Sequence, residues 1–313
     1  MTSYIIRRLL IFIPTLFGVI TAVFLILHAT PGNPAKRVLG KYATQEAVQE
    51  LEKQFGLDKP LYLQYTDFIS SYVQGDFGKS FRTKRPVINQ VLNELKFTLH
   101  LAIAGMLIST IMGVGVGIIS AIKPNSWIDN IARVVSLLGV SMPVFWSGMI
   151  LIIIFALNLN WFPIIGTGDP GKPLDLIHHL ILPALTVGAL TSAVTMRMTR
   201  SSMLDTLNED YIRTAFSKGL SPLYVYTKHA LRNAALPVVT IIGLNFGTLL
   251  GGAVLTETVF SRHGLGKLIV DAVKWKDYPT AQAGIFLFAV MFMVVNLLTD
   301  LSYGFLDPKI RYD

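Results

Sequence analysis

The chain has 313 residues, 52% of them hydrophobic and only 15% charged, and its mean hydropathy of +0.54 excludes an ordinary soluble protein. The same composition excludes a disordered chain, and the lack of cysteine excludes a disulfide scaffold and a cysteine metal site. The net charge of +8 does not indicate nucleic-acid binding, because basic loops on a membrane protein explain it.

Six runs without Lys, Arg, Asp or Glu are each long enough to cross a bilayer core, which takes about 20 helical residues. They cover residues 9–35, 97–122, 134–168, 176–196, 233–256 and 278–299. The third run is too long for one helix, so its helix is expected to end near Leu159, before an aromatic anchor at residues 161–163. The first run is too long for a cleaved signal peptide and is expected to stay as a helix. The chain is therefore predicted to be an all-α integral membrane protein with six transmembrane helices.

Lys and Arg in the short connections predict the orientation. With the N-terminus inside, the short inner segments carry more than twice as many of these residues as the short outer loops. This bias predicts a multi-pass protein of the cell (inner) membrane with both termini in the cytoplasm.

The long outer connection, residues 31–96, is expected to form a small folded cap. Apolar residues recur at helical spacing between a possible N-cap at Thr44 and a helix-ending Gly56, and they are Ala47, Val48, Leu51 and Phe55. An aromatic-rich segment at residues 61–73 leads to a turn at residues 75–78. Two interpretations stay open: a lid that packs on the helix ends, or a docking surface for an external partner.

The inner connection, residues 197–232, is expected to form two short helices around a tight turn. Asp205 or Thr206 can cap the first helix, Gly219 can end it, and Ser221-Pro222 can open the second, which runs toward residue 234. The first helix has an apolar stripe made of Leu204, Leu207, Tyr211 and Ala215. Glu209 and Arg213 stand four residues apart on its opposite face. Such an elbow is suited to a groove in a second protein, or to the lipid headgroups.

The elbow resembles the EAA loop of bacterial ABC-importer permeases, specifically the B-type subunit of the dipeptide, oligopeptide and nickel permease family. The similarity rests on DYIRTAFSKGL at residues 210–220 and HALRNAALPV at residues 229–238. Shorter segments along nearly the whole chain resemble the same family, in order: TPGNP at 30–34, GLDKP at 56–60, GDFG at 75–78, SMPVFW at 141–146, RSSM at 200–203, DL at 300–301 and DPKIR at 307–311.

The sequence departs from the general family pattern in three places. RTA at residues 213–215 replaces Glu-Ala-Ala, and Leu236-Pro237 lies five residues later than the usual Leu-Pro; both features resemble the peptide branch. The segment FSRHGLG at residues 260–266 lacks the aromatic residue and proline that relatives usually carry before the first glycine.

The resemblance implies a type I ABC importer permease fold with three parts: the first transmembrane helix and extracytoplasmic cap at 1–95, the permease core at 96–303 with the elbow at 200–234, and a cytoplasmic tail at 304–313. It places Glu209, Asp210, Arg213, Ala215 and Gly219 in the elbow that couples the chain to an ATPase. It also implies three kinds of protein partner: a homologous second permease, two ATP-binding subunits and an extracytoplasmic substrate-binding protein. Membrane lipid is the other expected contact, and no nucleic acid is expected.

The chain is not expected to be an enzyme or to bind a cofactor or metal itself. Its nearest approach to a phosphate-binding loop ends at Gly78-Lys79-Ser80 but has Val73 in place of the first glycine. ATP and Mg²⁺ are therefore expected in the partner subunits. His178 and His179 are adjacent, so their rings diverge and make a poor metal pair or catalytic site.

The resemblance implies import by alternating access, with di- or oligopeptides as the expected cargo and nickel or a metal chelate as the alternative within the family. An ion-coupled secondary transporter is a different class, disfavoured because the six runs hold no ionisable residue at mid-membrane; Asp300 lies at the inner end of the last helix.

Small residues within the runs are suited to close helix packing. They are Gly113, Gly115 and Gly117, followed by Gly243, Gly247, Gly251 and Gly252. Asn245, Thr248 and Glu257 are the candidates for lining an aqueous substrate pathway.

Overall fold

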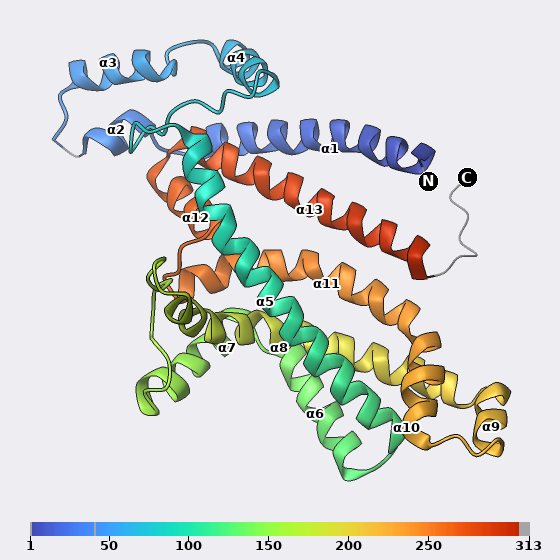
Figure 1. The fold of residues 1–313 in the computed structure, drawn as a ribbon. Coiled ribbons are helices and arrows are strands. Elements are labelled where there is room, and N and C mark those ends of the chain that lie inside the picture. The colour runs from blue at the N-terminus through green and yellow to red at the C-terminus, as the bar shows by residue number, and fades with distance from the viewer. Residues whose placement is uncertain (1, 41, 307–313) are drawn as a thin grey trace. The chain divides into compact units, whose positions relative to one another are not determined.

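The computed structural model describes residues 2–40 and 42–306, with side chains at residues 6–40 and 42–301. Helices make up most of this part, and its only strand-like pairing is a single bridge between Lys79 and Pro86 (Figure 1). The segment DPKIR at residues 307–311 and most of the expected tail at 304–313 lie outside the described residues.

The chain divides into two compact units. The core unit consists mainly of Leu99–Arg262, and the cap unit of Ile5–Thr98 and His263–Met293. The long helices α5 (Val87–Ile122) and α13 (Tyr278–Leu306) contribute to both units.

Five helical segments of the described chain are long and apolar enough to cross a membrane: Ile6–Ala29, Val87–Ile122, Pro173–Leu207, Pro222–Val259 and Tyr278–Leu301. A bent pair, Trp127–Ser141 and Val144–Asn158, supplies the sixth span, with an angle of 111° between its halves. The number of spans predicted from the sequence is confirmed when this pair counts as one.

The bend in the third span was not predicted from the sequence, which indicated one helix to about Leu159. The structure ends α6 (Trp127–Ser141) at Met142, continues with α7 (Val144–Leu151), and closes with the π-helical turn η1 (Ile152–Asn158). Met142 is extended, with φ −86° and ψ 132°, because the ring of the following Pro143 disfavours a helical conformation there. The predicted end of the helical run is confirmed.

The cap unit contains α1 (Thr2–Ala29), α2 (Pro34–Leu39), α3 (Gln45–Phe55), α4 (Leu61–Val73) and α12 (Leu265–Trp275). As predicted, the Thr44 side chain caps α3, and Gly56 ends it with a φ of +68°. Val48 and Leu51 are buried with Ala35, and the ring of Phe55 stacks on Phe81 with centroids 3.8 Å apart. The predicted α3 is therefore part of a packed fold.

The core unit is built around α8 (Pro173–Leu207) and α11 (Leu231–Val259), with α6, α7 and the end of α5 against them. Gly113 and Gly117 of α5 lie so close to α8 that an added Cβ would come within 2.6 Å of Thr195 and Thr199. Gly115 faces open space instead. The prediction of close packing thus holds for two of the three glycines.

The elbow differs from the predicted pair of short helices. Asp205 and Thr206, the expected caps, lie inside α8, which continues to Leu207. One short helix, α9 (Asp210–Ser217), follows, and Pro222 then opens α10 (Pro222–Tyr224), which continues through the π-helical turn η2 (Val225–Ala230) into α11. The elbow is therefore a single helix between two long spans (Figure 1).

Candidate functional site

The inward face of α9 is anchored in the apolar core of the elbow. Ile212 and Ala215, 1% and 7% exposed, pack in one cluster with Met203 of α8, Ala121 of α5 and Val225 of η2. Any displacement of α9 is therefore opposed by contacts with three neighbouring helical segments. This cluster connects the elbow mechanically to the long helices.

Tyr211 does not belong to this apolar face, contrary to the sequence prediction. It is 41% exposed, and its hydroxyl accepts a hydrogen bond of 2.6 Å from Asn233 Nδ2. Because α9 begins at Asp210, as a helix separate from α8, the stripe drawn through Leu204 and Leu207 does not continue into it. Ile212 takes the buried position instead.

The charged residues of the elbow are exposed. Arg213 Nη1 lies 3.6 Å from Asp210 Oδ1, while the Glu209 backbone carbonyl accepts from the N–H groups of Ile212 and Arg213. The ion pair of Arg213 is therefore with Asp210, rather than the Glu209 expected from the four-residue spacing. Pairs at such exposure contribute roughly 0–1 kcal/mol to stability, so these side chains are free to change partners.

Gly219 sets the direction of the chain after α9. Its φ is +78°, in the left-handed region that glycine adopts without strain, and no atom lies within 4 Å of the position of an added Cβ. Backbone bonds from Gly219 to Phe216 and from Leu220 to Ala215 close the turn. The sequence prediction of a helix end at this glycine is confirmed.

Large apolar side chains on the elbow face solvent. Phe216, Leu220, Leu223 and Tyr224 are between 37% and 73% exposed, and they surround the Gly219 turn in sequence. With Tyr211, they define what we call the elbow surface. An exposed apolar surface bordered by charged residues is typical of a protein–protein contact.

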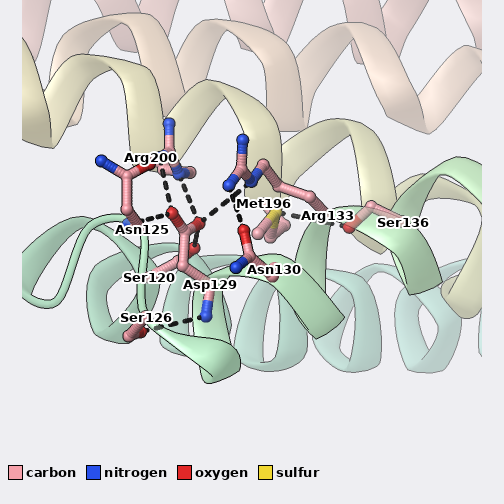
Figure 2. A network of polar contacts seen from close by, with 9 residues as sticks. All are labelled: Ser120, Asn125, Ser126, Asp129, Asn130, Arg133, Ser136, Met196 and Arg200. Carbon is pink, nitrogen blue, oxygen red and sulfur yellow. Dashed lines mark hydrogen bonds and ion pairs between the residues drawn. The ribbon is translucent and has the colours of Figure 1, made fainter.

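A buried ion pair joins α6 to α8, close in sequence to the point where α8 leads into the elbow (Figure 2). The Asp129 side chain on α6 is 0% exposed and accepts two hydrogen bonds from Arg200 on α8, from Nε at 2.7 Å and from Nη2 at 2.8 Å. Ser120 Oγ and the Asn125 backbone N–H also donate to this carboxylate. Four hydrogen bonds, from α5, from the loop before α6 and from α8, thus converge on one buried charge and satisfy it.

Sequence reasoning missed this ion pair. Arg200 was noted only within the segment RSSM, and Asp129 was not singled out, because 71 positions separate the two residues. The available signal was an acidic residue in the first turn of an otherwise apolar helix, with Ser126 as its N-cap.

The three candidate pathway residues on α11 lie in different surroundings. Asn245 is 8% exposed and donates to Thr195 Oγ1 of α8 at 3.1 Å, whereas Thr248 is exposed. Glu257 is fully buried near Arg262, which is 2% exposed. Burial lowers the pKa of Arg262, and the charge of Glu257 opposes this effect. The structure does not bring the three candidates together on one face.

Metal-ligating side chains are scattered in the part of the chain that the structure describes, which contains no group of three or more His, Asp or Glu able to hold an ion. The rings of His178 and His179 are inclined at 85°. His178 Nε2 lies 2.7 Å from the Trp161 carbonyl, and His179 Nδ1 lies 2.9 Å from the Asp175 carbonyl. Both rings have structural partners.

Comparison with known proteins covers the whole chain. Residues 113–312 match the family described as binding-protein-dependent transport system inner membrane component, and residues 1–102 match its N-terminal membrane component family. A dipeptide transport system permease of Alkalihalophilus pseudofirmus is 42% identical, and a glutathione transport system permease of Escherichia coli K12 is 45% identical. Both alignments span 100% of either chain.

Two solved structures share the fold of the greater part of the chain. An inward-facing structure of the methionine ABC transporter MetNI matches with a TM-score of 0.59 at 17% identity, covering 71% of this chain and 99% of the other. An amino acid ABC transporter solved with histidines matches with a TM-score of 0.52 at 14% identity, covering 69% and 94%. At these identities the likeness concerns architecture alone.

Proposed function

Because the chain belongs to the family of binding-protein-dependent transport system inner membrane components, we propose that it is the permease subunit of an ATP-driven importer for di- and oligopeptides. The observation that carries the cargo is full-length identity of 42–45% to permeases named for dipeptide and for glutathione, which is itself a tripeptide. The chain is not an enzyme: ATP hydrolysis belongs to partner subunits in this family.

The elbow surface is the contact for an ATP-binding subunit on the cytoplasmic side, with ATP and Mg²⁺ held by that subunit. Glu209, Asp210 and Arg213 present exchangeable charges there, and Gly219 fixes the direction of the turn. Ala215 acts from behind this surface, since it is packed in the elbow core with Ile212. Closure of the ATP-binding subunits displaces α9, and that core passes the displacement to α8, α11 and α5.

The complete importer contains a homologous second permease, two ATP-binding subunits and an extracytoplasmic substrate-binding protein. The extracytoplasmic cap, which follows the first transmembrane helix within residues 1–95, meets the binding protein. Residues 96–303 form the transport core, and both termini are cytoplasmic. This orientation follows the excess of Lys and Arg in the segments assigned to the inside.

Substrate passes along α11 by alternating access. Thr248 is exposed on this helix and contacts the substrate pathway. Asn245 and Glu257 support the pathway from within the core unit, where Asn245 is bonded to α8 and Glu257 lies beside Arg262. Thiol labelling of single-cysteine variants at these three positions tests the assignments, because the chain has no cysteine of its own.

The test is reconstitution of the complex in vesicles with its ATP-binding and substrate-binding subunits. We expect uptake of a radiolabelled tripeptide that requires ATP, with ATPase activity stimulated by the loaded binding protein. Uptake without nucleotide would indicate an ion-coupled transporter, and uptake of nickel without peptide would overturn the cargo.

The elbow surface has its own test in copurification. Leu223→Glu, at a 73% exposed position on the elbow, is expected to remove the ATP-binding subunits from the purified complex. Leu174→Glu, at an 82% exposed position at the start of α8, is the matched control and should leave them bound. Equal retention by the two variants would contradict the docking role.

A further inference from the structure

Two arginines face the single buried carboxylate of Asp129 (Figure 2). Arg200 holds it through two hydrogen bonds of 2.7 and 2.8 Å, while Arg133 Nε lies 3.6 Å from its Oδ1. The Arg133 side chain is 47% exposed, and its Nη2 donates to Asn130, which keeps the guanidinium close to the carboxylate. Arg133 is thus a near neighbour without being the main partner.

The two arginines belong to different helices. Arg200 lies on α8, one turn before Met203, which packs against Ile212 and Ala215 of the elbow helix. Arg133 lies on α6 with Asp129, four residues later, in the favourable order of acid before base. A shift of α8 relative to α6 therefore separates Asp129 from Arg200 but leaves Arg133 in place.

An unpaired carboxylate without exposed surface would oppose such a shift. Breaking a buried ion pair by removing one partner is strongly unfavourable, because the remaining charge has lost its hydration without compensation. Ser120 and Asn125 donate hydrogen bonds but carry no charge. A second cation on the same helix as Asp129 offsets part of this penalty.

The helix that carries Asp129 and Arg133 ends at a break in the chain, whereas the helix that carries Arg200 continues into the elbow. α6 ends at Met142, where the chain bends by 111° into α7, while α8 runs directly into the elbow. The contacts between α6 and α8 also include a weak hydrogen bond from Ser136 Oγ to Met196 Sδ at 3.3 Å. The helix that leads into the elbow and the helix that ends at this bend thus meet at the Asp129 ion pair.

We propose that Arg133 is a positioning residue for transport, which takes over Asp129 when α8 moves, so that α6 and α8 separate without exposing an unpaired buried charge. The inference rests on the proposed coupling of the elbow to an ATP-binding subunit. Arg200 stabilises one arrangement of the helices and Arg133 the other.

The first experiment measures tripeptide uptake by the reconstituted complex. Arg133→Ala is expected to lower the maximal rate about threefold, the order of effect of a half-exposed ion pair, with KM and subunit copurification unchanged. Arg133→Lys should restore most of the rate. Lys172→Ala removes an exposed cation of the core unit outside the elbow and is the control for net charge. An unchanged rate for Arg133→Ala, or an equal loss in the control, would overturn the proposal.

The second experiment does not depend on the cargo. The chain has no cysteine, so spin labels at Val134→Cys on α6 and Arg197→Cys on α8, both exposed, report the distance between these helices in the full complex. Trapping with ATP and vanadate should shift the distance distribution, and Arg133→Ala should shrink the shifted population. A distribution that ignores trapping, or ignores Arg133→Ala, refutes the exchange. Failed peptide uptake with a normal shift would count against the cargo only.

Discussion

Alanine at Gly113 and at Gly115 should have opposite effects, although the two glycines are two residues apart on α5. An alanine Cβ at Gly113 would lie 2.6 Å from Thr195 Cβ and 2.8 Å from the Ser192 carbonyl oxygen. Neither atom can rotate away, because one is attached to the α8 backbone and the other belongs to it. At Gly115 the same Cβ meets no atom within 4 Å.

The expected magnitudes follow from two competing terms. Replacing glycine by alanine inside a helix stabilises it by about 1 kcal/mol at either position. Overpacking costs about 1–3 kcal/mol, and it applies to Gly113 alone. Gly115→Ala should therefore be stabilising by up to about 1 kcal/mol, and Gly113→Ala destabilising, with about 1–3 kcal/mol between the two variants.

The assay is thermal unfolding in detergent, followed by the loss of the monodisperse peak on size-exclusion chromatography. Gly113→Ala should lose this peak at a temperature several degrees below Gly115→Ala. Gly117→Ala, whose Cβ would lie 2.6 Å from Thr199 Cβ, should behave like Gly113→Ala. Equal midpoints for all three variants would refute the close approach of α5 to α8.

The remaining predictions use the same assay. Arg200→Ala leaves Asp129 buried without its main partner and should destabilise the chain by up to about 3–5 kcal/mol, with Arg200→Lys restoring only part because lysine lacks the planar two-point donor. Asp277→Asn should cost about 1–3 kcal/mol, because the 4% exposed carboxylate accepts from two hydroxyls and a backbone N–H at 2.5–2.8 Å. Tyr72→Phe should be neutral or stabilising at pH 7, because the buried hydroxyl has no hydrogen-bond partner among residues 2–40 and 42–306. Burial raises the pKa of Tyr72 above its usual 10.0, so the folded state loses stability as the pH rises above 10, where the unfolded chain ionises more readily. Tyr72→Phe should remove this loss of stability at high pH. Tyr62→Phe, at a 68% exposed position, should leave it unchanged.

Local signals in the sequence predicted the ends of several elements correctly. Thr44 and Gly56 bound α3, and Gly219 ends α9, because caps and left-handed glycines act through neighbouring backbone groups. The predicted start of the elbow helix, at Asp205 or Thr206, was wrong because tertiary packing outweighed the local capping signal. Asp205 is an acceptable N-cap, but the packing of Met203 and Leu204 around it keeps α8 helical to Leu207.

The family resemblance inferred from the sequence is confirmed by the family match and by the named relatives. The type I ABC permease fold and the peptide branch of the family agree with the structural matches and with the named relatives. Within the spans, the bend before Pro143 is the main difference between the predicted helices and the structure. An apolar run has no periodic signal that separates one helix from two.

The sequence by itself determined that this protein is a helical membrane protein with six spans and an elbow between the fourth and fifth. Run length, charge-free composition and capping residues are properties of neighbouring positions, so they can be read in order along the chain. Tertiary structure alone decided which residues of those spans meet, including Asp129 with Arg200, Gly113 with Thr195, and Ile212 in place of Tyr211. A helix that is apolar all round carries no mark of the face turned to protein rather than lipid, and only packing against its neighbours fixes that rotation.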